Sequence, residues 1–182
     1  MKRFLILLTI IFAPGFLLAT TSTLYNIKAS SIDGKPVAMN QYKGKVLIIV
    51  NTASQCGYTP QLKGLEAIYK KYKSKGLEVL AFPSNDFKQD PSSNTEIMSY
   101  AQKNFQVSFP FFEKNSVVGA SQQPVYKYLT DKQPATVFKD VAWNFEKFIV
   151  GKNGEVLARF PSSTTPESEQ MIEAIEKALA KK

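Results

Sequence analysis

Cys56 is the single cysteine among 182 residues, and the sequence contains no histidine. The absence of histidine excludes a Ser-His-Asp triad, a Cys-His pair and the usual histidine-containing zinc or iron sites. A single cysteine also excludes an internal disulfide, CxxC redox chemistry and a cysteine-based metal cluster. Cys56 therefore either reacts alone or is a small buried hydrophobe, which is the commoner fate of a free cysteine.

If Cys56 reacts, its thiolate must be stabilised without an imidazole. A helix that begins after Cys56 would offer unpaired N–H groups and the positive end of its dipole. The indole N–H of Trp143 and the side-chain amides of Asn144 and of a glutamine are neutral donors that suit a thiolate and a departing oxygen. These residue types favour nucleophilic chemistry at sulfur.

The elements around Cys56 are predicted to form a βαβ unit. Residues 46–50 are a continuous β-branched and aliphatic run, typical of a strand covered on both faces. Residues 77–82 form a second such run, so the two strands are expected to be parallel. Between them, Pro60 suits a first helical turn and Gly76 a helix end, with apolar residues at helical spacing: Leu62, Leu65, Ile68, Tyr69 and Tyr72. Cys56 is thus expected in the loop between strand and helix.

The rest of the chain predicts further elements around this unit. A hairpin is expected over residues 27–38 around Asp33-Gly34, and another joins strands 147–150 and 156–160 through Lys152-Asn153-Gly154. Helices are expected over 95–104 and 166–181, with these residues facing inward: Ile97, Met98 and Ala101, then Met171, Ile172, Ile175 and Leu179. This order predicts an α/β fold, a thioredoxin-like sandwich with a central mixed β-sheet flanked by helices.

The first residues are typical of a secretory signal. Met1-Lys2-Arg3 forms a charged start, residues 4–13 form an apolar run, and Ala19 is a cleavage position. We therefore expect a signal peptide over residues 1–19, one domain over 20–182, and a secreted or periplasmic location. An uncleaved anchor is the weaker alternative, because Pro14-Gly15 interrupts a run that is short for a bilayer span of about 20 residues.

The charge balance is basic. The net charge is +8, and without residues 1–19 the chain has 21 basic and 15 acidic residues, a net charge of +6. The lysines of residues 70–75 are expected on a solvated helix face. No base-reading motif accompanies them, so no nucleic acid is expected as a partner, while weak contact with an anionic membrane surface stays open.

Five segments resemble motifs of the glutathione peroxidases, in the family's order and over nearly the whole of residues 20–182. Residues 51–60 are similar to the family's NVASxCGxTP segment around the reactive cysteine. The other four match or resemble FPCNQF, EI, FP and WNFEKF, and they are residues 82–87, Glu96-Ile97, Phe109-Pro110 and residues 143–148.

This resemblance implies a thioredoxin-like glutathione peroxidase domain of the single-cysteine, non-selenocysteine type. It places the family's catalytic Cys, Gln, Trp and Asn on Cys56, Gln89, Trp143 and Asn144. It also implies thiol-dependent reduction of hydrogen peroxide and of organic or lipid hydroperoxides to water or alcohols. The cysteine sulfenic acid would be resolved by an external thiol, such as glutathione or a thiol oxidoreductase, and no cofactor or metal is implied.

Several positions depart from the family's pattern. Ser84 and Ala101 stand where many members have cysteine, and Ala101 replaces the resolving cysteine of the thioredoxin-dependent type. Asp86 replaces the glutamine of FPCNQF and brings a carboxylate near the site. The stretch before Gln89 is one residue shorter than the family's FGxQEP. The short connection over residues 130–142 predicts a monomer with an open site that accepts bulky hydroperoxides.

Two other classes of protein compete with a glutathione peroxidase. A peroxiredoxin would need proline and threonine or serine before the cysteine, but Ile49 and Ala53 occupy those places. A thiol-based peroxide sensor, or a protein that binds lipid or a partner without sustained turnover, would use the same cysteine. Sustained turnover with peroxide and added thiol separates the enzyme from the sensor.

Overall fold

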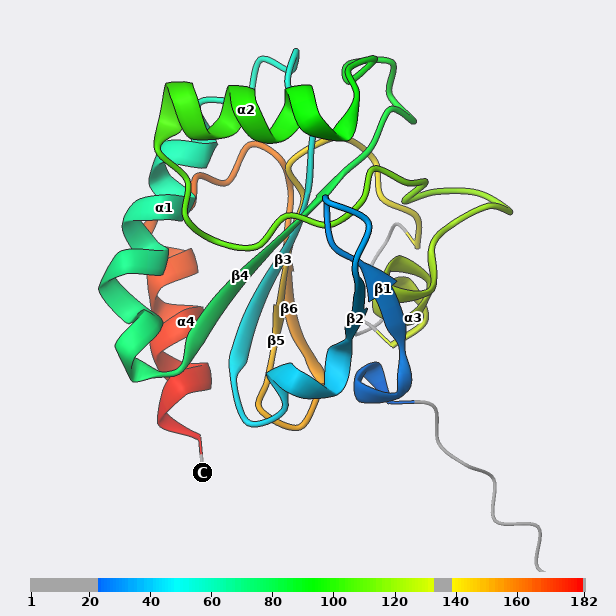
Figure 1. The fold of residues 1–182 in the computed structure, drawn as a ribbon. Coiled ribbons are helices and arrows are strands. Elements are labelled where there is room, and N and C mark those ends of the chain that lie inside the picture. Colours follow the sequence, from blue (N-terminus) through cyan, green and yellow to red (C-terminus); the bar gives the residue numbers. More distant parts are fainter. Residues whose placement is uncertain (1–22, 133–138, 182) are drawn as a thin grey trace, which may run out of the picture.

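The computed structural model describes residues 23–132 and 139–181 of the chain, built around one four-stranded sheet (Figure 1). The expected signal peptide, residues 1–19, lies outside the described residues. The sheet has the strand order β4-β3-β5-β6 and is mixed, because β3 is parallel to β4 and antiparallel to β5. Its strands are β3 (Val46–Thr52), β4 (Leu77–Pro83), β5 (Lys147–Val150) and β6 (Val156–Phe160).

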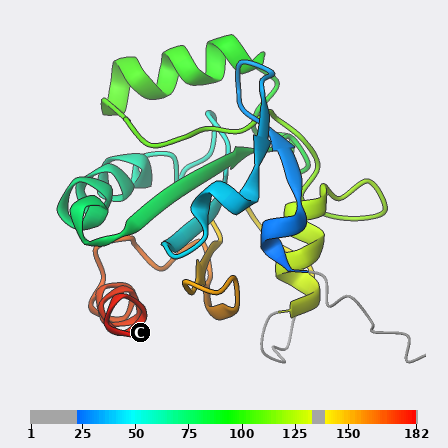
Figure 2. The ribbon, with the colours of Figure 1, turned by 60° about the horizontal axis from the view of Figure 1, so that its bottom comes forward.

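The helices and a small hairpin cover both faces of this sheet. Helices α1 (Gln61–Tyr72) and α4 (Glu169–Ala180) lie on one side, and α3 (Pro124–Lys132) lies on the other with strands β1 (Lys28–Ser30) and β2 (Pro36–Ala38) (Figure 2). Helix α2 (Asn94–Phe105) lies across the end where β3 and β4 finish (Figure 1). Three 3₁₀ turns complete the described chain: η1 (Leu24–Asn26), η2 (Met39–Tyr42) and η3 (Lys73–Lys75).

The central strand explains this layering. Successive side chains of a strand point to opposite faces, and every residue of β3 is buried. Val46, Ile48 and Val50 therefore join the core under α1, α2 and α4, whereas Leu47 and Ile49 join the core under α3. The α/β sandwich with a mixed sheet flanked by helices is thereby confirmed, as are the βαβ unit and both hairpins.

One helix was not predicted, and another begins later than expected. The sequence did not predict helix α3, because nine residues give only about two turns of periodicity and its apolar positions are few. Helix α4 begins at Glu169 and not at residue 166, since the residues before it form a turn in which Ser168 N–H donates to Thr165 O at 3.1 Å. On α4, Ile172 and Leu179 are only partly buried. In the described ranges, no helix is long and apolar enough to cross a membrane.

Lys147 is a fully buried lysine on β5 that holds the segment leading to α4. Its ammonium donates to the carbonyl oxygens of Pro161 and Ser162, both at 3.3 Å, and to that of Thr164. Burial lowers the pKa of Lys147 from 10.5 to about 8, although the charge of Glu146 acts in the opposite direction. This side chain gains hydrogen bonds to backbone carbonyls at the cost of a buried charge.

The depressed pKa of Lys147 predicts an unusual rise of stability with pH. Between about pH 8 and pH 10.5 the unfolded chain binds more protons than the folded one, so the free energy of unfolding increases, by at most about 1.4 kcal/mol per pH unit. The Lys147→Met variant lacks this rise, whereas Lys63→Met, at an exposed position, keeps it. Urea titrations at several pH values from 8 to 10 measure the slope. A flat or falling wild-type curve would contradict the account.

Candidate active site

Cys56 lies in the turn that joins β3 to α1, at the carboxyl end of the central strand. Its side chain is buried, with 6% of the residue exposed. The sulfur accepts a hydrogen bond from the Tyr58 N–H at 3.4 Å. The Thr59 hydroxyl closes the turn by donating to the Ala53 carbonyl at 2.8 Å. The amide at the sulfur therefore belongs to the turn and not to the helix N-terminus that the sequence suggested, because α1 begins only at Gln61.

The loop after β4 is tied to the Cys56 loop by two hydrogen bonds. The Gln55 N–H donates to the Gln89 carbonyl at 3.0 Å, and the Ser54 hydroxyl donates to Asp90 Oδ1 at 2.7 Å. Because β3 and β4 are adjacent and parallel, their carboxyl ends meet at one edge and bring these loops together. Gln89 thus comes to lie beside the residue that precedes Cys56.

Asp90 is a buried carboxylate within this connection. Burial raises the pKa of Asp90 above its usual range, and hydrogen bonds from Ser54 oppose the rise. Its Oδ2 has no hydrogen-bond partner among the described residues. The backbone on either side is fixed as well, since Lys88 adopts a left-handed φ of 58° and the Asp90 N–H donates to Asn85 Oδ1 at 3.0 Å.

A third segment brings Trp143 and Asn144 to the same end of the sheet, and Asn51 holds it there. Asn51, buried near the end of β3, accepts from the Phe145 N–H at 2.7 Å and from the Glu146 N–H at 3.1 Å. Its side-chain amide donates to the Trp143 carbonyl at 3.0 Å. Phe145 has a left-handed φ of 64°, a conformation that bulky residues rarely adopt and that these bonds sustain.

The side chains of this segment point to different surroundings. Asn144 is fully buried and its Nδ2 donates to Gln89 Oε1 at 3.0 Å, while its Oδ1 has no partner in the described part of the chain. Trp143 is 40% exposed and packs against the Phe87 ring with centroids 5.1 Å apart. The structure therefore joins Gln89 to Asn144 directly and brings Cys56 and Trp143 to the same end, whereas the sulfur's own hydrogen bond comes from Tyr58.

Glu146 and Arg159 fix the chain that leads into Trp143, and the sequence alone did not single them out. Glu146 Oε1 accepts from the Ala142 N–H at 2.7 Å, and its Oε2 accepts from Arg159 Nε at 2.7 Å and Nη2 at 2.6 Å. Arg159 also donates to the carbonyl oxygens of Lys139 at 3.2 Å and Asp140 at 2.6 Å. Both charged side chains are less than a tenth exposed.

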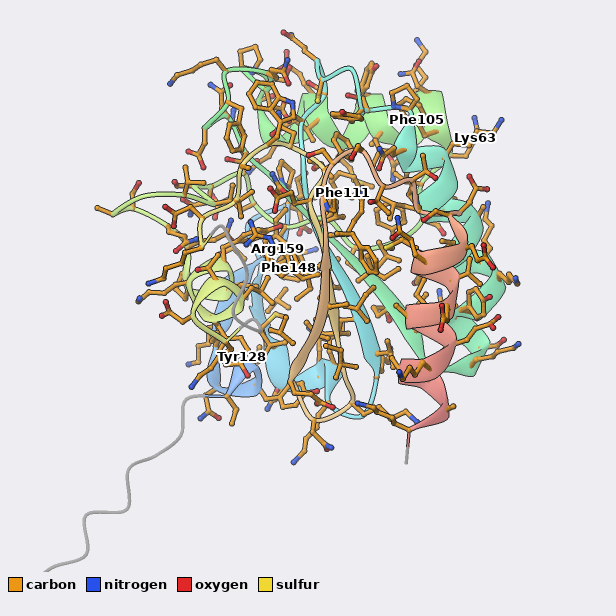
Figure 3. All side chains as sticks on the ribbon, turned by 180° about the vertical axis from the view of Figure 1, so that it is seen from behind. Lys63, Phe105, Phe111, Tyr128, Phe148 and Arg159 are labelled. Carbon is orange, nitrogen blue, oxygen red and sulfur yellow. The ribbon has the colours of Figure 1, made fainter. Side chains whose placement is uncertain are left out.

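The register between β5 and β6 places Arg159 near Glu146, because Arg159 pairs with Phe148, two residues after Glu146. The guanidinium lies 5.0 Å from the Phe148 ring centroid. Figure 3 labels the two side chains beside each other in the view from behind. A hairpin prediction alone could have given this pairing, but not the hydrogen bonds to residues 139, 140 and 142. The pair acts on the segment before Trp143 and has no contact with the sulfur.

The structure shows what Asp86 and Ala101 contact, at two positions where the sequence departs from the family's pattern. The Asp86 carboxylate accepts from the N–H groups of Val117 at 2.6 Å and Val118 at 3.2 Å and from the Ser116 hydroxyl. Asp86 therefore anchors residues 116–118. This differs from the expectation that Asp86 brings its carboxylate near the reactive sulfur. Ala101 is buried on α2 and shares a small apolar gap with Ala53 and Ser54. Within the described ranges, no cluster of acidic or cysteine side chains could hold a metal ion.

Comparisons with known proteins agree with this geometry. The family model for glutathione peroxidase matches residues 24–130. A glutathione peroxidase of Lactococcus lactis is 44% identical over 156 residues, covering 85% of this chain and 98% of that protein. A hydroperoxy fatty acid reductase of Synechocystis is 41% identical over 165 residues, covering 87% of this chain and 96% of that protein.

Solved structures show the same fold. The crystal structure of Trgpx in its apo form superposes with a TM-score of 0.70 at 34% identity, covering 87% of this chain and 96% of that one. A thiol:disulfide interchange protein of the thioredoxin family from Chlorobium tepidum has a TM-score of 0.63 at 15% identity, covering 85% and 93%, and shows the fold alone.

The thioredoxin-like fold with Cys56 at the carboxyl end of its central strand, together with the peroxidases that match this chain, defines the class as a thiol-dependent peroxidase. The chain belongs to the glutathione peroxidase family. It is an oxidoreductase that uses a thiol to reduce peroxides.

The Glu146–Arg159 pair should control how Trp143 is held. Arg159→Met leaves the Glu146 carboxylate buried without its partner, which lowers the free energy of unfolding by about 3–5 kcal/mol. In the protein that stays folded, we expect Trp143 emission to shift and oxidation of Cys56 by hydrogen peroxide to slow by about 10- to 100-fold. Trp143 is the only tryptophan, so its fluorescence reports the segment directly.

The double variant Arg159→Met/Glu146→Gln serves as the control for this prediction. It removes the unpaired charge, so most of the lost stability returns, while the hydrogen bonds to residues 139 and 140 stay absent. Slow oxidation in this stable double variant would support a positioning role. Wild-type oxidation rates and wild-type emission in both variants would exclude that role.

Proposed function

We propose that Cys56 is oxidised by the peroxide to a sulfenic acid, with Gln89, Trp143 and Asn144 as its hydrogen-bonding partners. The observation that carries this proposal is the 3.0 Å bond between Asn144 and Gln89, with Gln89 tied through its carbonyl to the residue before Cys56. The buried Asn144 Oδ1 has no hydrogen-bond partner among the described residues, so one acceptor of this amide pair stays unused. Neutral amide donors complement the developing negative charge on sulfur and on the departing oxygen.

The oxidation and its reversal need only sulfur chemistry. An S–O bond forms between the Cys56 thiolate and one peroxide oxygen while the O–O bond breaks; sulfur loses two electrons and the other oxygen leaves as water or an alcohol after taking a proton. An external thiol then condenses with the sulfenic acid, releasing water and forming a mixed disulfide. A second thiol displaces Cys56 and departs as a disulfide. The sequence contains no second cysteine that could form an internal disulfide with Cys56, so the reducing thiol must come from another molecule.

We propose hydrogen peroxide and organic or lipid hydroperoxides as substrates. Exposed aromatic surface near the site supports bulky substrates, since Tyr58 and Trp143 are 36% and 40% exposed and Phe87 packs on Trp143. The relative from Synechocystis that is named a hydroperoxy fatty acid reductase points the same way. The short connection over residues 130–142, part of which lies outside the described residues, supports an open site and a monomer.

We further propose an exported protein that makes weak contact with anionic membrane surfaces. The signal-like residues 1–19 support export, and the net charge of +6 that remains without them supports the membrane contact. Glutathione or a thiol oxidoreductase is the external reductant in this proposal, because the sequence holds no second cysteine that could reduce Cys56.

Substitutions at the site should separate its members by their effect. Cys56→Ser abolishes turnover with hydrogen peroxide and added thiol. Trp143→Phe and Asn144→Ala stay folded and slow the oxidation step by about 10²-fold each, because each loses one preorganised donor. Asn104→Ala is the matched control, since that exposed amide on α2 donates to the Tyr100 carbonyl of its own helix. Stopped-flow oxidation, and mass spectrometry after one equivalent of hydroperoxide, measure these effects.

Two results would overturn the mechanism. One is peroxidase turnover in Cys56→Ser. The other is a wild-type protein that is oxidised once and then reduced by neither small thiols nor a thiol oxidoreductase, which would assign Cys56 to a peroxide sensor.

Export and assembly state are checked on the protein recovered from the producing cell. We expect an N-terminus near Thr20, because cleavage after Ala19 removes the apolar segment. N-terminal sequencing gives the cleavage site, and light scattering on the same sample gives the mass of one chain. A soluble cytosolic form that keeps Met1, or a stable tetramer, would contradict the respective part of the proposal.

A further inference from the structure

The charges of the described residues are separated along the sheet. We define the basic pole as residues 43–45, 70–78, 151–155 and 176–181. It contains nine lysines and three acidic residues, whereas the rest of the described chain has eleven basic and twelve acidic residues. The whole positive excess of the described chain therefore lies in the basic pole. Seven of its nine lysines are exposed, and they are Lys43, Lys70, Lys71, Lys73, Lys75, Lys177 and Lys181.

Strand pairing places the four segments of the basic pole at one end of the molecule. Val46 pairs with Leu77, so the lysines just before β3 and β4 start side by side. The Gly44 N–H donates to the Lys152 carbonyl at 3.0 Å, which adds the β5–β6 turn, and Lys152 Nζ donates to the Leu179 carbonyl at 2.9 Å, which adds the end of α4. Figure 1 shows these segments together at the bottom, opposite the loop that follows β3.

The acidic residues of the basic pole are occupied by near neighbours. Glu78 is paired with Lys45 at 2.7 Å, Glu176 accepts from the Tyr72 hydroxyl at 2.6 Å, and Glu155 accepts from the Asn153 N–H at 3.2 Å. Three of the lysines lie over tyrosine rings, at 4.8–5.4 Å from the ring centroids: Lys71, Lys73 and Lys75. Lys70 is ion-paired as well, with Glu66 just outside the basic pole at 3.1 Å, so the charge directed at the surroundings comes from the lysines other than Lys45 and Lys70.

We infer that the basic pole rests on an anionic lipid bilayer and that Cys56 then faces away from the bilayer. This deepens the membrane contact in the proposed function, because it names the surface and the orientation. The seven residues of β3 separate the two ends of the sheet by about 23 Å. Hydrogen peroxide, hydroperoxides that are free in the water and the reducing thiol would therefore reach Cys56 from the aqueous side, whereas hydroperoxides still held in the bilayer would not.

One observation favours a bilayer over another polyanion. All nine basic residues of the basic pole are lysines, spread over four segments at one end of the molecule, and such a broad surface of point charges suits a diffuse layer of anionic headgroups. Lysine clusters of this kind bind anionic headgroups diffusely.

Vesicle sedimentation of the exported protein tests the inference. We expect binding to vesicles of phosphatidylglycerol and phosphatidylcholine, no binding to phosphatidylcholine alone, and release when salt is raised from about 0.1 M to about 1 M. Lys43→Gln/Lys71→Gln/Lys75→Gln should weaken partitioning by about a hundredfold, at about fivefold for each lysine near the surface. The matched control Lys28→Gln/Lys63→Gln/Lys103→Gln removes three exposed lysines outside the basic pole and should weaken it much less.

The single tryptophan reports the orientation. Trp143 lies at the Cys56 end and is 40% exposed, so a quencher carried on the lipid chains should leave its fluorescence unchanged in the bound protein, while acrylamide in the water still quenches it. Quenching of Trp143 by the lipid-borne probe would overturn the orientation. Equal loss of vesicle binding in the two triple variants would overturn the inference that the basic pole binds the membrane. Binding to duplex DNA but not to anionic vesicles would overturn it too.

Peroxidase activity in solution keeps this inference separate from the proposed function. None of the six substituted lysines contacts Cys56 or its hydrogen-bonding partners, so both triple variants should turn over peroxide at the wild-type rate without vesicles. Normal peroxidase activity without vesicle binding would reject the inference that the basic pole binds a bilayer and leave the proposed mechanism intact. Absent activity in the wild-type protein would reject the proposed mechanism and leave the vesicle result standing.

Discussion

The hydrogen bonds of Asn51 are the constraint on which the reactive end of the molecule depends. Asn51 is fully buried on the central strand, so its position is fixed by the sheet. Through three bonds it holds the backbone from Trp143 to Glu146, including the left-handed Phe145. A left-handed phenylalanine is unfavourable unless its surroundings over-determine it. The result is a sharp turn that leaves Trp143 at the surface and Asn144 inside the protein, where it bonds Gln89.

The absence of histidine gives this constraint its importance. An imidazole could compensate for loose geometry, since its charge acts over several ångströms. Amide and indole N–H groups are neutral, and their effect falls steeply when distance or angle departs from hydrogen-bond geometry. The chain therefore supports each donor with its own hydrogen bonds: Asn51 for residues 143–146, Gln55 for the Gln89 carbonyl, and the Glu146–Arg159 pair for the segment before Trp143.

Local sequence patterns predicted the elements but not the contacts between them. The β-branched run of β3, the apolar run of β4 and the spacing of α1 are local signals, and all three elements form. Helix α3 was not predicted, because its nine residues carry little helical periodicity. The bond from the Tyr58 amide to sulfur depends on the geometry of a turn, and the binding of Asp86 to residues 116–118 depends on contacts about thirty residues apart. Residue types alone do not specify such contacts.

The family motif and the structure select overlapping residues for different reasons. WNFEKF matched as a string, yet its polar members make separate contacts. Asn144 bonds Gln89, Glu146 binds Arg159 and the Ala142 amide, and Lys147 holds the carbonyls before α4. Two of these residues, Glu146 and Lys147, bury charge. Buried charge is costly and needs specific partners, so each fixes one loop against the sheet. The segment thus stabilises the reactive end with charges that face inward, which keeps the groups nearest Cys56 neutral.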